Sequence, residues 1–166
     1  MQTRRTLMTQ ALAASAALAA TAQAAELSVA RSKAITRDQF DQYVALYNAA
    51  DPGFTQFYND DVVMETVPPL TSAAEIRRFR SELSCYVVET VQVEYYFADE
   101  NGSAAQLLGE FRCVRDMPFT AMSGLFGKAV RKGQVLKQRN SILYGVVNGK
   151  FKWIRASPPI ILQDWN

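Results

Sequence analysis

The pattern of apolar and polar positions predicts three helices between residues 36 and 85. The first begins at Thr36, with Gln39 three residues later as its capping-box partner. Apolar and aromatic side chains then recur at the spacing of one helix face, at Phe40, Tyr43, Val44 and Tyr47. Asp51 and Pro52 provide an N-cap and a first-turn proline for a short second helix over 53–59.

A strand separates the second helix from the third. Residues 61–67 alternate between apolar and polar side chains, and the two prolines directly after them end the strand. Ser72 and Glu75 form a second capping box, and the apolar stripe of the third helix extends to about Cys85.

After residue 86, apolar side chains recur at every second position, which is the period of β-strands. Four long strands are predicted there: 87–97, 105–113, 133–147 and 151–157. On the first of these, one face is formed by Val91, Val93, Tyr95 and Phe97. Turn signals at 99–102 and 148–149 join the strands in antiparallel pairs. This order predicts an α+β fold, in which three N-terminal helices pack against one face of a curved antiparallel sheet.

The first 24 residues follow neither pattern. Arg4 and Arg5 lie in a basic head, an alanine-rich stretch follows, and the small-x-small sequence at 22–24 suits signal cleavage. We interpret residues 1–24 as a cleaved export signal of twin-arginine type, with an ordinary amphipathic helix as the alternative. The signal predicts a periplasmic or secreted protein with no stable membrane span after cleavage. A leader at 25–35, one domain over 36–160 and a C-terminal tail at 161–166 complete the chain.

Removal of this signal changes the charge balance. The chain has 18 Lys and Arg against 16 Asp and Glu, and loss of Arg4 and Arg5 leaves 16 against 16. A neutral domain lacks the positive field on which nucleic-acid binding depends, so nucleic acid is not expected as a partner. With no histidine and only two cysteines we expect no metal and no cofactor, and a catalytic site that uses an imidazole base is excluded.

Four segments resemble known proteins: 43–51, 57–65, 74–79 and 141–150. They are similar to the nuclear transport factor 2-like superfamily and, more narrowly, to its SnoaL-like and ketosteroid-isomerase-like members, over roughly residues 36–157. The resemblance implies a cone formed by the curved sheet and the helices, an apolar pocket inside it, and a homodimer formed through the outer sheet face. Because this fold hosts isomerases, cyclases, dehydratases and binding domains, it specifies the reaction poorly.

The resemblance also assigns positions. Tyr43 stands where ketosteroid isomerases have a tyrosine that donates a hydrogen bond to an enolate oxygen, and Asn140 stands where they have a protonated aspartic acid. Thr66 occupies the position of the proton-shuttling aspartate. A threonine hydroxyl does not abstract a carbon-bound proton near neutral pH, so the isomerase mechanism itself does not carry over.

Strand alternation independently places Gln138 and Asn140 on the apolar, inward face of 133–147, since its lysine and arginine fall on the other face. We expect five residues to contact a ligand: Tyr43, Tyr47, Thr66, Gln138 and Asn140. The alternative is that these polar groups are paired within a packed core.

Other acid-base candidates are carboxylates, namely Asp61, Glu65, Glu89, Glu94 and Glu110. For each we favour a solvated or ion-paired surface role, because buried unpaired carboxylates are rare. The pleat should point Glu65 away from Thr66.

Two further features stay open at this point. The apolar loop at 117–132 suits a lid over the pocket, but equally a cover for a sheet edge or a dimer contact. Cys85 and Cys113 flank one hairpin, which permits a disulfide in an oxidising compartment, although Cys113 also falls on the inward register of a buried thiol.

Three classes of function follow. The favoured one is an exported protein that binds a small, largely apolar molecule, possible carbonyl compounds included, in the cone. The second is a SnoaL-like isomerase, cyclase or dehydratase with an unidentified carboxylate base in place of Thr66. The third is an accessory domain whose outer sheet face binds another protein.

Overall fold

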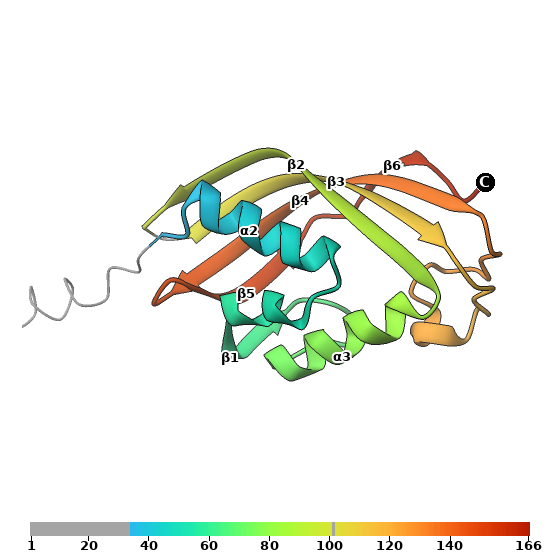
Figure 1. Ribbon diagram of the computed structural model, residues 1–166, viewed down its shortest axis with the longest axis horizontal. Coiled ribbons are helices and arrows are strands. Elements are labelled where there is room, and N and C mark those ends of the chain that lie inside the picture. The colour runs from blue at the N-terminus through green and yellow to red at the C-terminus, as the bar shows by residue number, and fades with distance from the viewer. Residues whose placement is uncertain (1–33, 101) are drawn as a thin grey trace, which may run out of the picture. The chain divides into compact units, whose positions relative to one another are not determined.

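The computed structural model describes residues 34–100 and 102–166. The predicted signal at 1–24 and all but the last two residues of the predicted leader at 25–35 lie outside the described residues. Helices α2 (Arg37–Asn48) and α3 (Ala73–Ser84) and the 3-10 helix η1 (Pro52–Phe57) lie on one side of a curved sheet (Figure 1). The strands are β1 (Tyr58–Met64), β2 (Val87–Asp99), β3 (Gly102–Cys113), β4 (Val135–Val147), β5 (Lys150–Ala156) and β6 (Ile160–Gln163).

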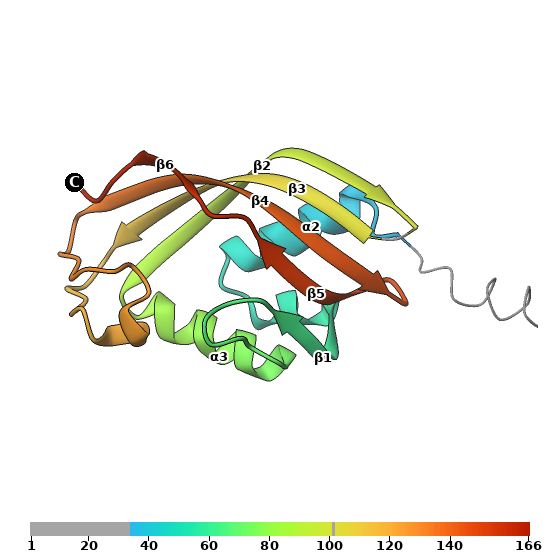
Figure 2. The ribbon, with the colours of Figure 1, turned by 180° about the vertical axis from the view of Figure 1, so that it is seen from behind.

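The sheet has the order β1-β5-β4-β3-β2, and β6 pairs with β4 beyond the end of β5. All pairings are antiparallel except that of β1 with β5, which is parallel. The long strands β2, β3 and β4 arch over the helices, as Figure 2 shows from behind. The predicted α+β fold is therefore confirmed, with the refinement that the sheet is mixed.

The helix starts follow the predicted caps. Thr36 and Gln39 form the complete capping box of α2. At α3 the hydroxyl of Ser72 accepts from the backbone N–H of Glu75, but the Glu75 carboxylate accepts from the N–H and hydroxyl of Thr71 instead of closing the box. The predicted short helix is a 3-10 helix that begins at Pro52, and β1 starts at Tyr58, three residues earlier than expected.

Most of the core consists of aromatic side chains between α2 and the sheet. Phe40 is fully buried, stacks on Tyr96 with ring centroids 4.4 Å apart, and meets Phe151 edge-on at 6.4 Å. On β3 every second residue from Ser103 to Cys113 is buried, so the predicted alternation is confirmed. Burial of these large rings is the main driving force that holds the helices on the sheet.

One predicted strand face is wrong. On β2 the pairing with β3 shifts between Val93 and Tyr95, because a β-bulge inserts one residue at Glu94. The bulge reverses the alternation, so Tyr96 packs inward while Tyr95 and Phe97 are exposed. A bulge of this kind leaves no periodic signal in the sequence.

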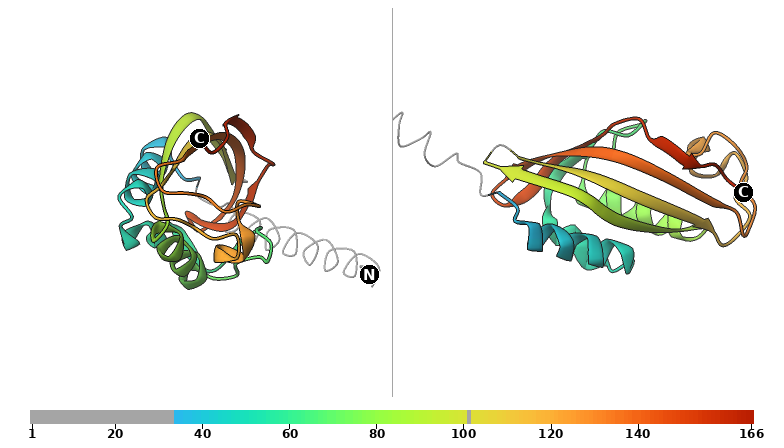
Figure 3. Two further views of the ribbon diagram at one scale, coloured as in Figure 1. Left: turned by 90° about the vertical axis from the view of Figure 1, so that its right-hand side faces the viewer. Right: turned by 90° about the horizontal axis from the view of Figure 1, so that it is seen from above.

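A second cluster of buried side chains lies at the other end of the sheet, near the C-terminus (Figure 3). It includes Met117 and Val130, which pair by a β-bridge at the base of the loop predicted at 117–132. Residues 161–166, predicted as a tail, continue the sheet through β6, and Trp165 is buried against Phe126 with ring centroids 5.0 Å apart. The loop thus covers an end of the sheet.

Cys85 is exposed and Cys113 is buried, and both thiols are free. Of the two possibilities that the sequence left open, the structure favours the buried thiol. None of the helices in the described segments combines the length and apolar character needed to cross a lipid bilayer.

Candidate functional site

A cavity of about 190 Å³ lies under the arch of the sheet, between α2 and the strands. Most of its wall is apolar. It is lined by Tyr43, Val44, Tyr47, Met64, Glu65, Thr66, Glu89, Val91, Leu107, Ile142, Tyr144, Ile154 and Ala156. Apolar walls with a few polar groups are typical of small-molecule sites.

Helix α2 contributes two tyrosines to the cavity. Tyr43 and Tyr47 are four residues apart, so the helix places them on one face, one turn apart. The hydroxyl of Tyr43 lies 2.9 Å from that of Tyr58 on β1, and either can be the donor. Burial raises the pKa of Tyr43 to about 12, so its phenol stays neutral and keeps a proton to donate.

Glu89 on β2 is the buried carboxylate of the cavity. The hydroxyl of Tyr47 donates to its Oε2 at 2.7 Å, and Nη1 of Arg80 lies 3.8 Å from the same oxygen. No hydrogen bond to Oε1 of Glu89 is found within the described residues. Burial raises the pKa of Glu89, and the charge of Arg80 and the hydrogen bond from Tyr47 oppose that shift only in part. This carboxyl is therefore tuned toward proton exchange.

Arg80 supports Glu89 from outside the cavity. Its side chain is 6% exposed, its Nη2 donates to the backbone carbonyl of Glu89 at 3.3 Å, and its guanidinium lies 4.5 Å from the centre of the Tyr47 ring. Its Nε and Nη1 have no hydrogen-bond partner in the described part of the chain. Three side chains from α2, α3 and β2 thus form one buried polar cluster.

Tyr144 on β4 supplies a further phenol. Its side chain is buried, lines the cavity, and has its pKa held well above 10.0 chiefly by burial. No hydrogen bond to its hydroxyl is found among the residues that the structure describes. A neutral phenol without a protein partner is available to donate to a ligand oxygen.

Thr66 and Glu65 border the cavity just after β1 ends. The Thr66 hydroxyl donates to the carbonyl of Pro68 at 2.7 Å, and Arg155 donates to both carboxylate oxygens of Glu65, at 2.6 and 2.8 Å. The expectation that Glu65 points away from Thr66 is wrong, because the strand stops at Met64 and its alternation no longer applies.

Gln138 and Asn140 do not line this cavity, so the expected convergence of Asn140 with Tyr43 is not found. The amide of Asn140 donates to the carbonyl of Ser157 at 3.3 Å. Between β5 and β6 the chain passes through two prolines, which have no N–H to donate across to β4. Asn140 therefore closes a gap in the ladder, while Tyr43, Tyr47 and Thr66 do meet at the cavity.

Four of the five candidate carboxylates are ion-paired as expected: Asp61 with Lys152, Glu65 with Arg155, Glu94 with Arg139, and Glu110 with Arg112 and Lys137. Glu89 is the exception. Two signals in the sequence point to it: Glu89 interrupts an inward strand face between Val87 and Val91, and Arg80 interrupts the apolar helix stripe of Ile76 and Leu83. Opposite charges on two apolar faces indicate a buried pair.

Among the described residues, no cluster of three or more His, Cys, Asp or Glu side chains is positioned to hold a metal ion. The cavity polar groups are phenols, one hydroxyl and carboxyls, which favour hydrogen bonding and proton transfer.

Comparison with solved structures identifies the architecture. A protein from Pseudomonas putida assigned as a polyketide cyclase superposes with a TM-score of 0.59 at 18% identity, over 72% of this chain and 87% of that one. The fold is nuclear transport factor 2-like. No protein-family model matches the sequence, and no curated protein matches it.

Two other structures of this nuclear transport factor 2-like group differ in what they do. A Kribbella flavida protein assigned as a ketosteroid isomerase has a TM-score of 0.52 at 17% identity, covering 80% of this chain and 87% of its own. A computationally designed binder of 17-OHP has a TM-score of 0.54 at 17% identity, covering 73% and 94%. At these identities the likeness establishes the fold and leaves the activity to the residues of the cavity.

Proposed function

We propose that this protein binds a small, largely apolar molecule that carries a carbonyl or similar oxygen, in the cavity under the sheet. The observation that carries the proposal is the unpartnered Tyr144 hydroxyl in a wall that is otherwise mostly apolar. Burial of the apolar part of the ligand supplies affinity, and the phenols of Tyr43 and Tyr144 orient its oxygen. Similar folds that include an isomerase-type protein and a designed steroid binder are compatible with this role.

The experiment uses 2-tetralone and its hydrocarbon analogue tetralin, which differ by the carbonyl oxygen. Chemical-shift changes in the full chain are followed by NMR at Val91 and Ile142, which line the cavity, and at Val88, which is exposed on β2. We expect 2-tetralone to bind at least about fivefold more tightly than tetralin, since one hydrogen bond contributes about 1 kcal/mol. Equal affinities, or shifts confined to Val88, would contradict the proposal.

A second function, acid-base catalysis, is favoured by Glu89. A buried carboxylate with a raised pKa and a free oxygen is suited to remove a proton from the carbon next to a carbonyl. The neutral phenol of Tyr144 would then stabilise the developing enolate oxygen. In this second proposal Glu89 supplies the base that Thr66 does not, for an isomerisation, cyclisation or dehydration.

Deuterium uptake by 2-tetralone in D₂O, followed by NMR, tests this second function. Glu89→Gln should reduce the protein-catalysed uptake at least about 100-fold, the scale of general base catalysis. Glu65→Gln is the matched control, because Glu65 also borders the cavity but is held by Arg155. Equal loss in both variants, or no uptake above the buffer rate with wild type, would leave ligand binding as the function and reject the catalytic one.

A further inference from the structure

A groove of about 840 Å³ lies on the surface between α3 and the turn that joins α2 to η1. One wall is the face of α3 that carries Arg77, Arg80, Ser81 and Ser84, at successive helical turns. The opposite wall is apolar and consists of Ala50, Pro52 and Phe54. The groove is distinct from the cavity, whose lining it does not share.

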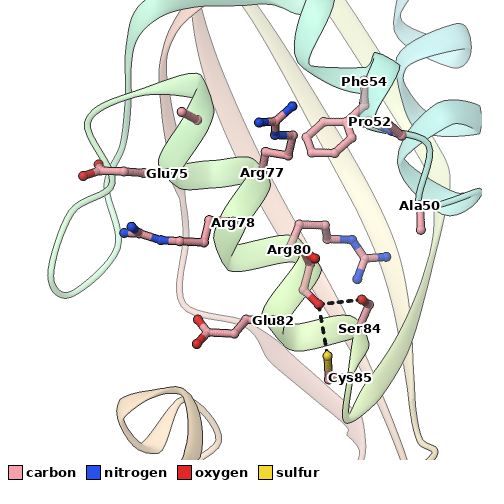
Figure 4. Close-up of a pocket in the computed structure, with 12 residues that line it drawn as sticks. Ala50, Pro52, Phe54, Glu75, Arg77, Arg78, Arg80, Glu82, Ser84 and Cys85 are labelled. Atoms are coloured by element: carbon pink, nitrogen blue, oxygen red, sulfur yellow. Dashed lines mark hydrogen bonds between the residues drawn. The ribbon is translucent and has the colours of Figure 1, made fainter.

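The charges of α3 are sorted between its two sides. In Figure 4 the side chains of Arg77 and Arg80 extend toward Phe54 and Ala50, whereas Glu75, Arg78 and Glu82 point to the other side of the helix. The Glu75 carboxylate is also held by Thr71. The groove therefore faces two guanidinium groups, and the helix turns its carboxylates away from it.

Neither guanidinium is fully satisfied. Arg77 makes no ion pair with any described residue. Arg80 is nine-tenths buried, and its Nε and Nη1 lack hydrogen-bond partners in the segments that the structure describes. Unpaired buried guanidinium nitrogens are costly, and a carboxylate satisfies two of them at once through a bidentate contact.

We propose that this groove is a second binding site, for an amphipathic carboxylate. The carboxylate group lies between Arg77 and Arg80, and its hydrocarbon part lies along Pro52 and Ala50. A carboxylate attached to an apolar chain matches a site with cations on one wall and an apolar surface on the other.

The test titrates octanoate into the full chain and follows backbone amides of Ser81, Ser84 and Ala50 by NMR. We expect these amides to shift, and Arg77→Gln to weaken octanoate binding at least about fivefold. Arg78→Gln is the matched control, because Arg78 is equally exposed on the same helix but points to the other side, and it should change affinity less than about twofold. In a separate titration, 1-octanol should bind at least about tenfold more weakly than octanoate.

Equal effects of the two arginine variants, or equal affinities of octanoate and 1-octanol, would overturn the groove site. Shifts confined to Val91 and Ile142 would also overturn it, because they would place octanoate in the cavity. That last result would support the proposed ligand-binding function, and loss of tetralone binding would leave the groove site intact, so the two proposals fail separately.

Discussion

The hydroxyl of Tyr47 donates a 2.7 Å hydrogen bond to Oε2 of Glu89 and so ties α2 to the start of β2. This bond joins residues 42 positions apart and lies at the wall of the cavity. It stabilises the charged form of a carboxyl whose burial favours the neutral form. The protonation state of the cavity therefore depends on the contact between a helix and a strand.

Removal of that hydroxyl should raise the pKa of Glu89 further. Tyr47→Phe keeps the ring and the burial but deletes the hydrogen bond that lowers this pKa. The shift is measured by a ¹³C NMR titration of the glutamate carboxyl carbons. Tyr43→Phe serves as control, since the Tyr43 hydroxyl bonds Tyr58 and not Glu89. An unchanged titration in Tyr47→Phe would show that the bond does not set the pKa.

Two tyrosine variants should separate ligand binding from stability. Tyr144→Phe removes a hydroxyl without a protein partner, so we expect weaker 2-tetralone binding by about 1 kcal/mol and little change in melting temperature. Tyr96→Phe removes a 2.6 Å hydrogen bond to the carbonyl of Ile35, outside the cavity, and should lower the melting temperature with little effect on affinity. The reverse pattern would place the Tyr144 hydroxyl in the packed core.

Stability should respond to pH through Glu89. In the unfolded chain this carboxyl titrates near its ordinary pKa of 4.5, and in the folded protein its pKa is higher. Between these two values the folded state holds a proton that the unfolded state has released, so the free energy of unfolding falls as the pH rises through that interval.

Urea unfolding of wild type and Glu89→Gln, from about pH 4 to about pH 8, measures this contribution. Wild type should lose stability relative to the variant as the pH rises above 4.5, and the difference should level off above the folded pKa. Carboxylates with lowered pKa values, such as Glu94, act in the opposite direction but are present in both proteins and cancel. A difference that does not vary with pH would contradict the raised pKa.

We propose that the protein is a homodimer formed through the outer sheet face, where Leu143, Trp153 and Phe97 are exposed. Sedimentation should give about twice the monomer mass, and Leu143→Arg should give a monomer. Phe119→Arg is the control, since Phe119 is equally apolar and exposed but lies in the loop after β3. A monomer only in Phe119→Arg would assign the contact to that loop, and monomeric wild type would reject the dimer.

The N-terminal signal remains a prediction from Arg4, Arg5 and the small residues at 22–24. We expect the protein in the periplasmic or secreted fraction of a bacterial host to begin at about residue 25, as N-terminal sequencing would show. Replacement of Arg4 and Arg5 by lysines should retain the protein in the cytoplasm if the signal is of twin-arginine type. Recovery of cytoplasmic wild type that begins at Met1 would contradict export.

The sequence by itself determined the order of the elements, the caps of α2 and η1, and the buried alternation of β3, because each depends on residues close together in the chain. It also predicted correctly that Asp61, Glu65, Glu94 and Glu110 are paired. These features follow from local spacing and from the high cost of burying a charge.

Only the tertiary structure decided which polar residues share the cavity. The bulge at Glu94 reversed the outer part of β2, and the prolines after β5 drew Asn140 to the ladder, although both positions fitted a regular strand. Glu89 became the buried carboxyl because α2 and α3 bring Tyr47 and Arg80 to it from distant parts of the chain. Desolvation, and with it the pKa of Glu89, depends on that assembly, and no local pattern measures it.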